Sequence, residues 1–222
     1  MVMSKRIIDF LNELSANNNK SWFDAQRAAY EAAKTDLVDI AAEVISELAN
    51  VDPLIGPQDP KKCVFRINRD VRFSKNKDPY KTNMGAFIVP GGKNAPNAGY
   101  YMHFEPGQSF VGGGIYAPQP DVLNAIRREI YYQSADFKAI IFDPFFQNMF
   151  GELMNEQLVN VPKGFPADFA DGNLLKYKHY VVSRSFEPEN QTKSEIVDFV
   201  MDTFKAMRDF NAFLNRAVRN LE

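Results

Sequence analysis

The residues with the clearest chemical potential lie together in one basic stretch, residues 61–81. The stretch holds eight lysines and arginines against two aspartates, so its formal charge is +6, and the rest of the chain must carry −8 to reach the total of −2. A concentration of one charge on an otherwise acidic protein attracts ligands of the opposite charge. We therefore interpret the stretch as an anion-binding loop.

Arginine and lysine suit such a site in different ways. Arginine offers a fork of donors that matches phosphate or carboxylate, and lysine offers a point charge. In "SKNKDPYKTN" (74–83) we expect Asp78 to form an Asx turn and Pro79 to fix one backbone angle, which indicates an ordered loop. The predicted ligand-binding residues are Arg66, Arg69, Asp70, Arg72, Lys75, Lys77, Tyr80, Lys81 and Thr82.

Two structural interpretations of the same stretch stay open. Lysines often protect an exposed sheet edge, so the stretch would then be a solvated strand followed by a polar turn. Alternatively, the aspartate of "RDVRF" pairs with an arginine and fixes the bend between strand and loop. Replacement of Asp70 by Asn would then lower stability and leave any binding untouched.

A second candidate is the alternating pattern in "YYMHFE". Successive side chains of a strand point to opposite faces, so Tyr101, His103 and Glu105 share one face. A histidine beside a carboxylate can act as a general base, which makes His103 and Glu105 the candidate catalytic residues. The alternative is a structural histidine, and the sequence leaves open whether the protein is an enzyme.

Several other chemistries lack the residues they need. The chain has two histidines and one cysteine, too few for a His/Cys zinc site, and we predict no metal site, although a carboxylate magnesium site stays open. No phosphate-binding glycine motif, HExxH sequence or nucleophile elbow occurs, and the sequence leaves the cofactor unknown. Cys63 allows no intrachain disulfide and is expected to be a buried thiol.

These observations favour one class of ligand over another. We expect an anionic small molecule, phosphorylated or carboxylated. The alternative is a nucleic acid, with phosphates on the basic stretch and Phe65, Phe73 or Tyr80 stacked on bases, or an acidic protein partner. The overall pI of about 5.8 argues against a nucleic acid. Without a signal peptide or an apolar run of membrane length, we expect a soluble, cytoplasmic protein that does not bind membranes.

The hydrophobic periods predict the elements that carry these residues. Helical spacing occurs over residues 6–14, 21–48, 118–133, 136–152 and 194–221, and strands are expected at 64–74, 85–90, 99–105, 109–116 and 176–187. The strands at 99–105 and 109–116 flank Pro106-Gly107 and predict an antiparallel hairpin. The Pro-Gly pair matches a type II turn better than the primed hairpin turns, which leaves a longer loop and the register open. Helices at both ends of about five mostly antiparallel strands indicate a single α+β domain, residues 1–222, with a phenylalanine-rich core.

The basic stretch also carries a family resemblance. The segment "RINRDVRFSKNKDPYKTNMGAFI" resembles the signature of domain-of-unknown-function family 2461, conserved hypothetical proteins of bacteria and fungi. The similarity extends to "NNNKSWFDAQRAAYE" and "GYYMHFEPGQSFVGGGIYAPQPDVLNAIRREI" and covers about residues 5–215, with one departure at Asn76, where an acidic residue is expected. The resemblance implies one intact domain of a shared fold and no particular activity. The motif positions are Arg69, Asp70, Arg72, Phe73, Lys77, Pro79, Tyr80, Lys81 and Thr82.

Overall fold

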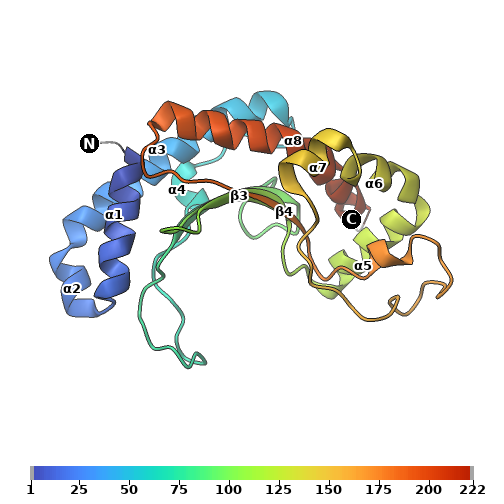
Figure 1. The fold of residues 1–222 in the computed structure, drawn as a ribbon, viewed down its shortest axis with the longest axis horizontal. Helices are drawn as coiled ribbons and strands as arrows, with labels where there is room; N and C mark the ends of the chain where they lie inside the picture. The colour runs from blue at the N-terminus through green and yellow to red at the C-terminus, as the bar shows by residue number, and fades with distance from the viewer. Residues whose placement is uncertain (1–2, 221–222) are drawn as a thin grey trace. The chain divides into compact units, whose positions relative to one another are not determined.

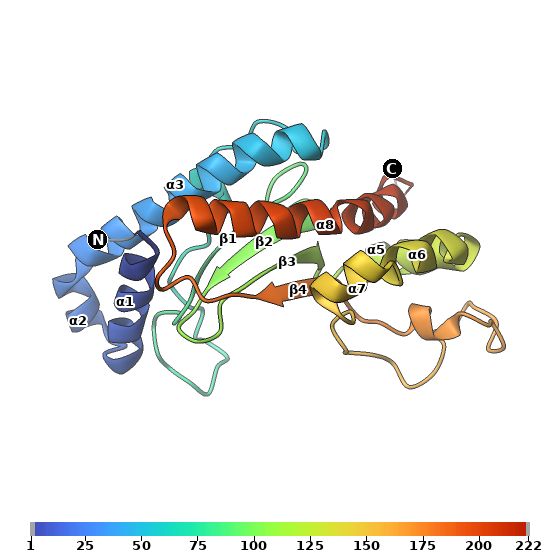
Figure 2. The same ribbon diagram turned by 45° about the horizontal axis from the view of Figure 1, so that its top comes forward.

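The computed structural model describes residues 3–220. Within this part of the chain, helices α1 (Met3–Ala16), α2 (Lys20–Ala25), α3 (Arg27–Val51) and α4 (Pro60–Cys63) precede strands β1 (Met84–Ile88), β2 (Gly99–Phe104) and β3 (Phe110–Ile115). Helices α5 (Pro120–Tyr132), α6 (Ser134–Ile141) and α7 (Pro144–Phe150), the 3-10 helix η1 (Gly172–Leu175), strand β4 (Tyr180–Ser185) and helix α8 (Lys193–Arg219) follow (Figure 1 and Figure 2). None of these helices combines the length and the apolar character needed to cross a membrane.

The strands form one antiparallel sheet in the order β1-β2-β3-β4. This sheet, with helices at both ends of the chain, confirms the predicted single α+β domain, with four strands in the described residues where about five were expected. The hairpin between β2 and β3 is also confirmed. Gln108 N donates to Glu105 O at 3.0 Å, and Gly107 has φ +69°, the positive angle that the third residue of a type II turn requires.

The strand expected at residues 64–74 is wrong. This segment makes only two isolated bridges, Val64 with Ala86 and Asn68 with Tyr80, and Figure 1 shows the chain between α4 and β1 as a long loop that extends away from the strands. Its alternating pattern has no core to face at the far end, where Phe73 is 96% exposed. Polar side chains of the loop hydrogen-bond to its own backbone, and such bonds compete with a strand ladder.

The contacts of the chain group it into two compact units. Unit 1 runs to Ile88 and includes Tyr101–Val111 and Ser185–Asp202. Unit 2 comprises Val89–Tyr100, Gly112–Arg184 and the chain from Thr203 onward. Both candidate sites of the sequence, the basic stretch and the Tyr101–Glu105 pattern, belong to unit 1.

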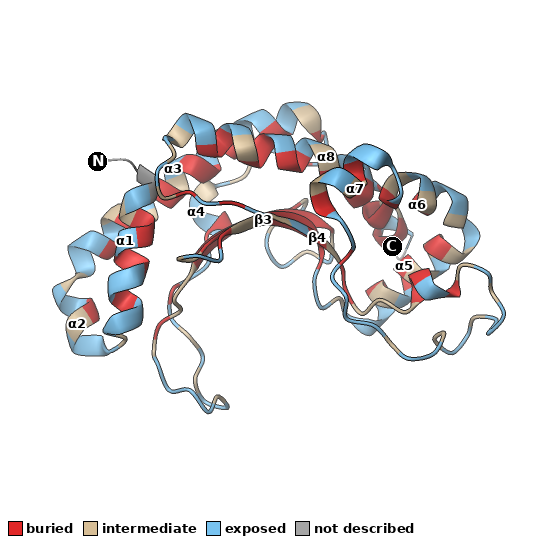
Figure 3. Cartoon of the chain, viewed as in Figure 1, coloured by how far each residue is buried: buried red, intermediate tan, exposed pale blue. Residues whose placement is uncertain are grey.

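The helical core of unit 1 is formed by α1 and α3. The predicted apolar stripe of α1 is confirmed, because Ile7, Leu11 and Leu14 are fully buried, and Figure 3 shows a buried and an exposed stripe along this helix. A charged pair joins the two helices, since Arg6 Nε donates to the buried Asp36 carboxylate at 2.7 Å. Together these contacts make α1 and α3 a rigid support for the α1–α2 corner.

Unit 2 contains helices α5, α6 and α7, the 3-10 helix η1 and the part of α8 from Thr203 onward. Its phenylalanines confirm the predicted aromatic core, with Phe137, Phe204 and Phe210 fully buried. The helix expected over 136–152 is instead two helices, α6 and α7. Asp143 accepts hydrogen bonds from the first backbone amides of α7, and Pro144 occupies its first turn, so the chain ends one helix and starts another there.

Candidate anion-binding site

The end of the basic stretch is attached to the helices of unit 1 through Tyr80. The Tyr80 ring is 6% exposed and stacks on Phe23 of α2, with ring centroids 4.0 Å apart. Asn18, between α1 and α2, donates from Nδ2 to Tyr80 O at 3.0 Å and accepts from Tyr80 N at Oδ1 at 3.1 Å. The Asn18 amide therefore hydrogen-bonds to both the N–H and the C=O of Tyr80, as the backbone of a neighbouring strand would, and fixes the backbone there.

Arg69 orders the rest of the loop. Its Nη1 donates to Asp78 O at 3.1 Å and its Nη2 to Ser74 Oγ at 3.3 Å, while its backbone N donates to Pro79 O at 2.9 Å. The predicted Asx turn of Asp78 is wrong by two residues: Asn76 Oδ1 accepts from Asp78 N at 2.8 Å, so Asn76 forms the turn. The loop is ordered as expected, but by different side chains.

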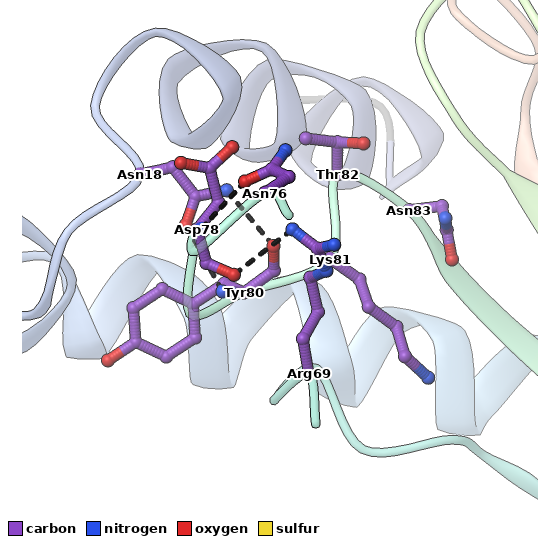
Figure 4. Close-up of a pocket in the computed structure, with 8 residues that line it drawn as sticks. All are labelled: Asn18, Arg69, Asn76, Asp78, Tyr80, Lys81, Thr82 and Asn83. Atoms are coloured by element: carbon purple, nitrogen blue, oxygen red, sulfur yellow. Dashed lines mark hydrogen bonds between the residues drawn. The ribbon is translucent and has the colours of Figure 1, made fainter. Parts of the chain in front are cut away.

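These contacts enclose a polar hollow of about 220 Å³ in unit 1 (Figure 4). It is lined by Asn18, Arg69, Asn76, Asp78, Tyr80, Lys81, Thr82 and Asn83. Arg69, Lys81 and Asp78 give this lining a net formal charge of +1, and the remaining side chains add amide and hydroxyl groups. Of the predicted ligand-binding residues, the structure brings together Arg69, Lys81 and Thr82, and also Tyr80, whose ring points away from the hollow (Figure 4).

Five predicted ligand-binding residues lie outside the lining of the hollow. Arg66, Lys75 and Lys77 are exposed, and Lys77 Nζ donates to Val71 O at 3.0 Å. The other two, Asp70 and Arg72, are exposed as well.

Asp70 and Arg72 form an exposed ion pair within the loop. Arg72 Nε donates to Asp70 Oδ1 at 2.9 Å and Arg72 Nη2 to Asp70 Oδ2 at 2.6 Å. These hydrogen bonds from Arg72 lower the pKa of Asp70. The alternative in which Asp70 pairs with an arginine is thus confirmed as a contact, and Arg72 is directed at Asp70 instead of at the hollow.

Sequence reasoning missed all three amide side chains that line the hollow, those of Asn18, Asn76 and Asn83. For Asn18 a signal was present in "NNN" at the break between two helices. Asn19 is the N-cap of α2, because its side chain accepts from Trp22 N, and this leaves Asn18 for a different task. The sequence does not show that this task concerns Tyr80, 62 residues later.

The predicted common face of Tyr101, His103 and Glu105 is confirmed as a chain of hydrogen bonds. Tyr101 Oη lies 2.9 Å from His103 Nδ1, and His103 Nε2 lies 3.0 Å from Glu105 Oε2. Thr82 Oγ1 donates to Glu105 Oε1 at 3.0 Å. This series of hydrogen bonds therefore starts at Thr82, which lines the hollow, and ends at Tyr101 on strand β2.

The direction of one of these hydrogen bonds follows from the carboxylate. A carboxylate only accepts hydrogen bonds, so His103 Nε2 donates to Glu105 Oε2. Burial, together with the charge of Glu105, raises the pKa of Tyr101 to about 12. Both ring nitrogens of His103 are engaged, and its ring also stacks on Phe110 with centroids 4.6 Å apart. In this arrangement His103 orients Glu105.

Two further predictions concern metals and Cys63. Cys63 is a buried thiol, as expected, although it ends helix α4 and does not start a strand. Within residues 3–220 no three His, Cys, Asp or Glu side chains gather in a way that could hold a metal ion.

Comparison with protein families relates the whole site to one family. The model for conserved hypothetical proteins of the DUF2461 family matches residues 6–213. The chain belongs to this family. The DUF2461 match confirms the predicted relationship and includes every residue of the hollow and of the hydrogen-bond chain. No curated protein matches the chain significantly, and neither does any solved structure.

Proposed function

We propose that this DUF2461 protein binds a small phosphorylated or carboxylated molecule in the hollow of unit 1. The observation that carries the proposal is the joint lining by Arg69 and Lys81, two cations supported by amide donors on the same hollow. Anionic oxygens accept charge-assisted hydrogen bonds from both types of cation, and these are among the strongest in proteins.

The Arg69 side chain is already held in one conformation by hydrogen bonds to the loop. A guanidinium has five N–H donors, and its two hydrogen bonds to the loop use two of them, so three remain for a ligand among the contacts of the described chain. Because the side chain is already held in place, binding costs little additional side-chain entropy.

The hollow also limits the class of ligand. At about 220 Å³ it is smaller than the pockets of roughly 300–1,000 Å³ that hold drug-sized molecules. Asp78 adds a carboxylate to the lining, so a ligand that carries a hydroxyl or an amino group next to its anionic group matches the lining best. We therefore expect a compact phosphate ester or a hydroxy or amino acid.

The test is thermal stability against phosphates, sugar phosphates, nucleotides and small hydroxy and amino acids at two salt concentrations. A ligand that binds only the folded state raises the melting temperature. The shift should be lost in Lys81→Met and kept in Lys75→Met, which removes the same charge from an exposed position of the same loop outside the hollow. Equal shifts in the two variants would overturn the proposal.

A second candidate function is nucleic-acid binding by the outer part of the loop. One observation favours it: the Phe73 ring is 96% exposed, and the Arg72 guanidinium lies 5.9 Å from its centroid. An exposed ring beside cations can stack on bases of a single strand. Binding of a short oligonucleotide should then weaken steeply with salt and fall in Phe73→Ala; a salt-independent affinity would exclude this candidate.

A further inference from the structure

Thr82 is the one described residue that both lines the hollow and belongs to the hydrogen-bond chain on the sheet. We propose that Thr82 is a ligand-operated switch: an anion in the hollow accepts the hydrogen bond of the Thr82 hydroxyl, and Glu105 Oε1 is thereby released to accept a hydrogen bond from a water molecule or from the ligand. This inference rests on the proposed function, because it requires an anionic ligand in the same hollow.

The first step follows from the number of donors on each group. A threonine hydroxyl carries one hydrogen, and in the structure that hydrogen is directed at Glu105 Oε1, 3.0 Å from Thr82 Oγ1. Phosphate and carboxylate oxygens accept hydrogen bonds. An anion that reaches Thr82 therefore competes with Glu105 for a single donor, and when the anion obtains it Glu105 Oε1 loses this partner.

The second step concerns the carboxylate that is released. Glu105 Oε2 keeps the Nε2–H of His103 at 3.0 Å, and the other ring nitrogen of His103 lies 2.9 Å from Tyr101 Oη. The carboxylate thus stays oriented when Oε1 is released. His103 and Tyr101 are positioning residues in this arrangement, and Glu105 is the group whose hydrogen-bond partner changes.

The third step is the reach of Glu105 into the hollow. A ligand oxygen bonded to Thr82 lies about 2.7–3.0 Å from Oγ1, so it lies within about 6 Å of Glu105 Oε1 when the 3.0 Å from Thr82 is added. One water molecule or one ligand hydroxyl spans that distance. This O–H group then donates a hydrogen bond to Glu105 Oε1 in place of Thr82.

The two histidines of the chain make the switch measurable. The ring nitrogens of both are observed by NMR in histidine-labelled full-length protein while inorganic phosphate is added. When Glu105 loses the Thr82 hydrogen bond, its carboxylate becomes a stronger acceptor, so the Nε2–H proton of His103 should shift downfield. His179, whose Nε2 lies 2.9 Å from Glu156 in unit 2, should not move.

Two substitutions at Thr82 separate this inference from the proposed function. Thr82→Val keeps the shape without the donor, so His103 should be shifted before phosphate is added and should not respond to it; Thr82→Ser should behave like the natural protein. If phosphate raises the melting temperature while His103 stays unmoved, the switch is wrong and the binding site stands. If neither phosphate nor any other member of the ligand panel stabilises the protein, the proposed function fails and the switch fails with it.

Discussion

Replacement of Asn18 by Ala tests how the hollow is assembled. Asn18 makes two hydrogen bonds with the backbone of Tyr80, at 3.0 and 3.1 Å, and both are partly buried. A net contribution of about 0.5–1.5 kcal/mol for each gives an expected loss of about 2 kcal/mol in the free energy of unfolding. For a chain of this size, such a loss lowers the melting temperature by about 4–8 °C.

The assay is urea denaturation of Asn18→Ala and two companion variants. Asn18→Asp keeps the acceptor for Tyr80 N but directs a carboxylate at Tyr80 O, so it should lose at least as much stability. Asn17→Ala is the matched control, because Asn17 makes an exposed bond to Glu13 O and should change stability by less than about 0.5 kcal/mol. If Asn18→Ala is as stable as this control, Asn18 does not hold the loop.

Three further variants test other parts of the site. Burial raises the pKa of Tyr101 to about 12, so the stability that Tyr101 contributes is complete below pH 10 and is lost as the pH rises through 12. Tyr101→Phe should remove this loss of stability. The difference in phenolate absorbance between the natural protein and this variant should have its midpoint near pH 12. Gly85→Ala places a Cβ 2.6 Å from Tyr101 Oη, so it should cost about 1–3 kcal/mol and shift the ring nitrogens of His103; unchanged histidine signals would contradict the hydrogen-bond chain. Asp70→Asn removes an exposed charge that pairs with Arg72 outside the hollow, so the phosphate shift of the melting temperature should persist, and its disappearance would place this pair in the binding site.

The helices and the hairpin could be predicted because their signals are local. The stripe of α1 repeats every three to four residues, and the Pro106-Gly107 pair matches the turn that Gly107 adopts with its positive φ. The strand expected at residues 64–74 failed for the opposite reason. A strand requires a neighbour along its whole length, and alternation in one segment does not show whether that neighbour exists.

In the candidate site, too, the contacts within one strand were predictable and the contacts between distant segments were not. Period-two spacing was enough to place Tyr101, His103 and Glu105 on one face, because that geometry is a property of a single strand. The attachment of Asn18 to the loop was not predictable, since it depends on the tertiary packing of two segments far apart in the sequence. Charge showed where cations gather, and only the structure showed which of them share a hollow.

The same distinction changes the interpretation of the basic stretch. Its eight basic side chains do not all face one ligand, because several of them make contacts within the loop itself. Asp70 neutralises Arg72, and Lys77 donates to the backbone at Val71. Lys81 lies 5.5 Å from the centroid of the Phe65 ring while it also lines the hollow. The hollow is therefore lined by fewer cations than the charge of the stretch suggests.

The most direct test of anion binding in the hollow is calorimetric titration. Inorganic phosphate, as the common probe, and the compounds that raise the melting temperature are titrated into the natural protein, Lys81→Met and Lys75→Met. A hydrogen bond to a charged group contributes about 1.5–3 kcal/mol, so Lys81→Met should weaken binding by about 10- to 100-fold. Lys75→Met should bind like the natural protein, because Lys75 lies on the same loop outside the hollow. If both variants lose affinity equally, the loop attracts anions only by its general charge, and the hollow is not a binding site.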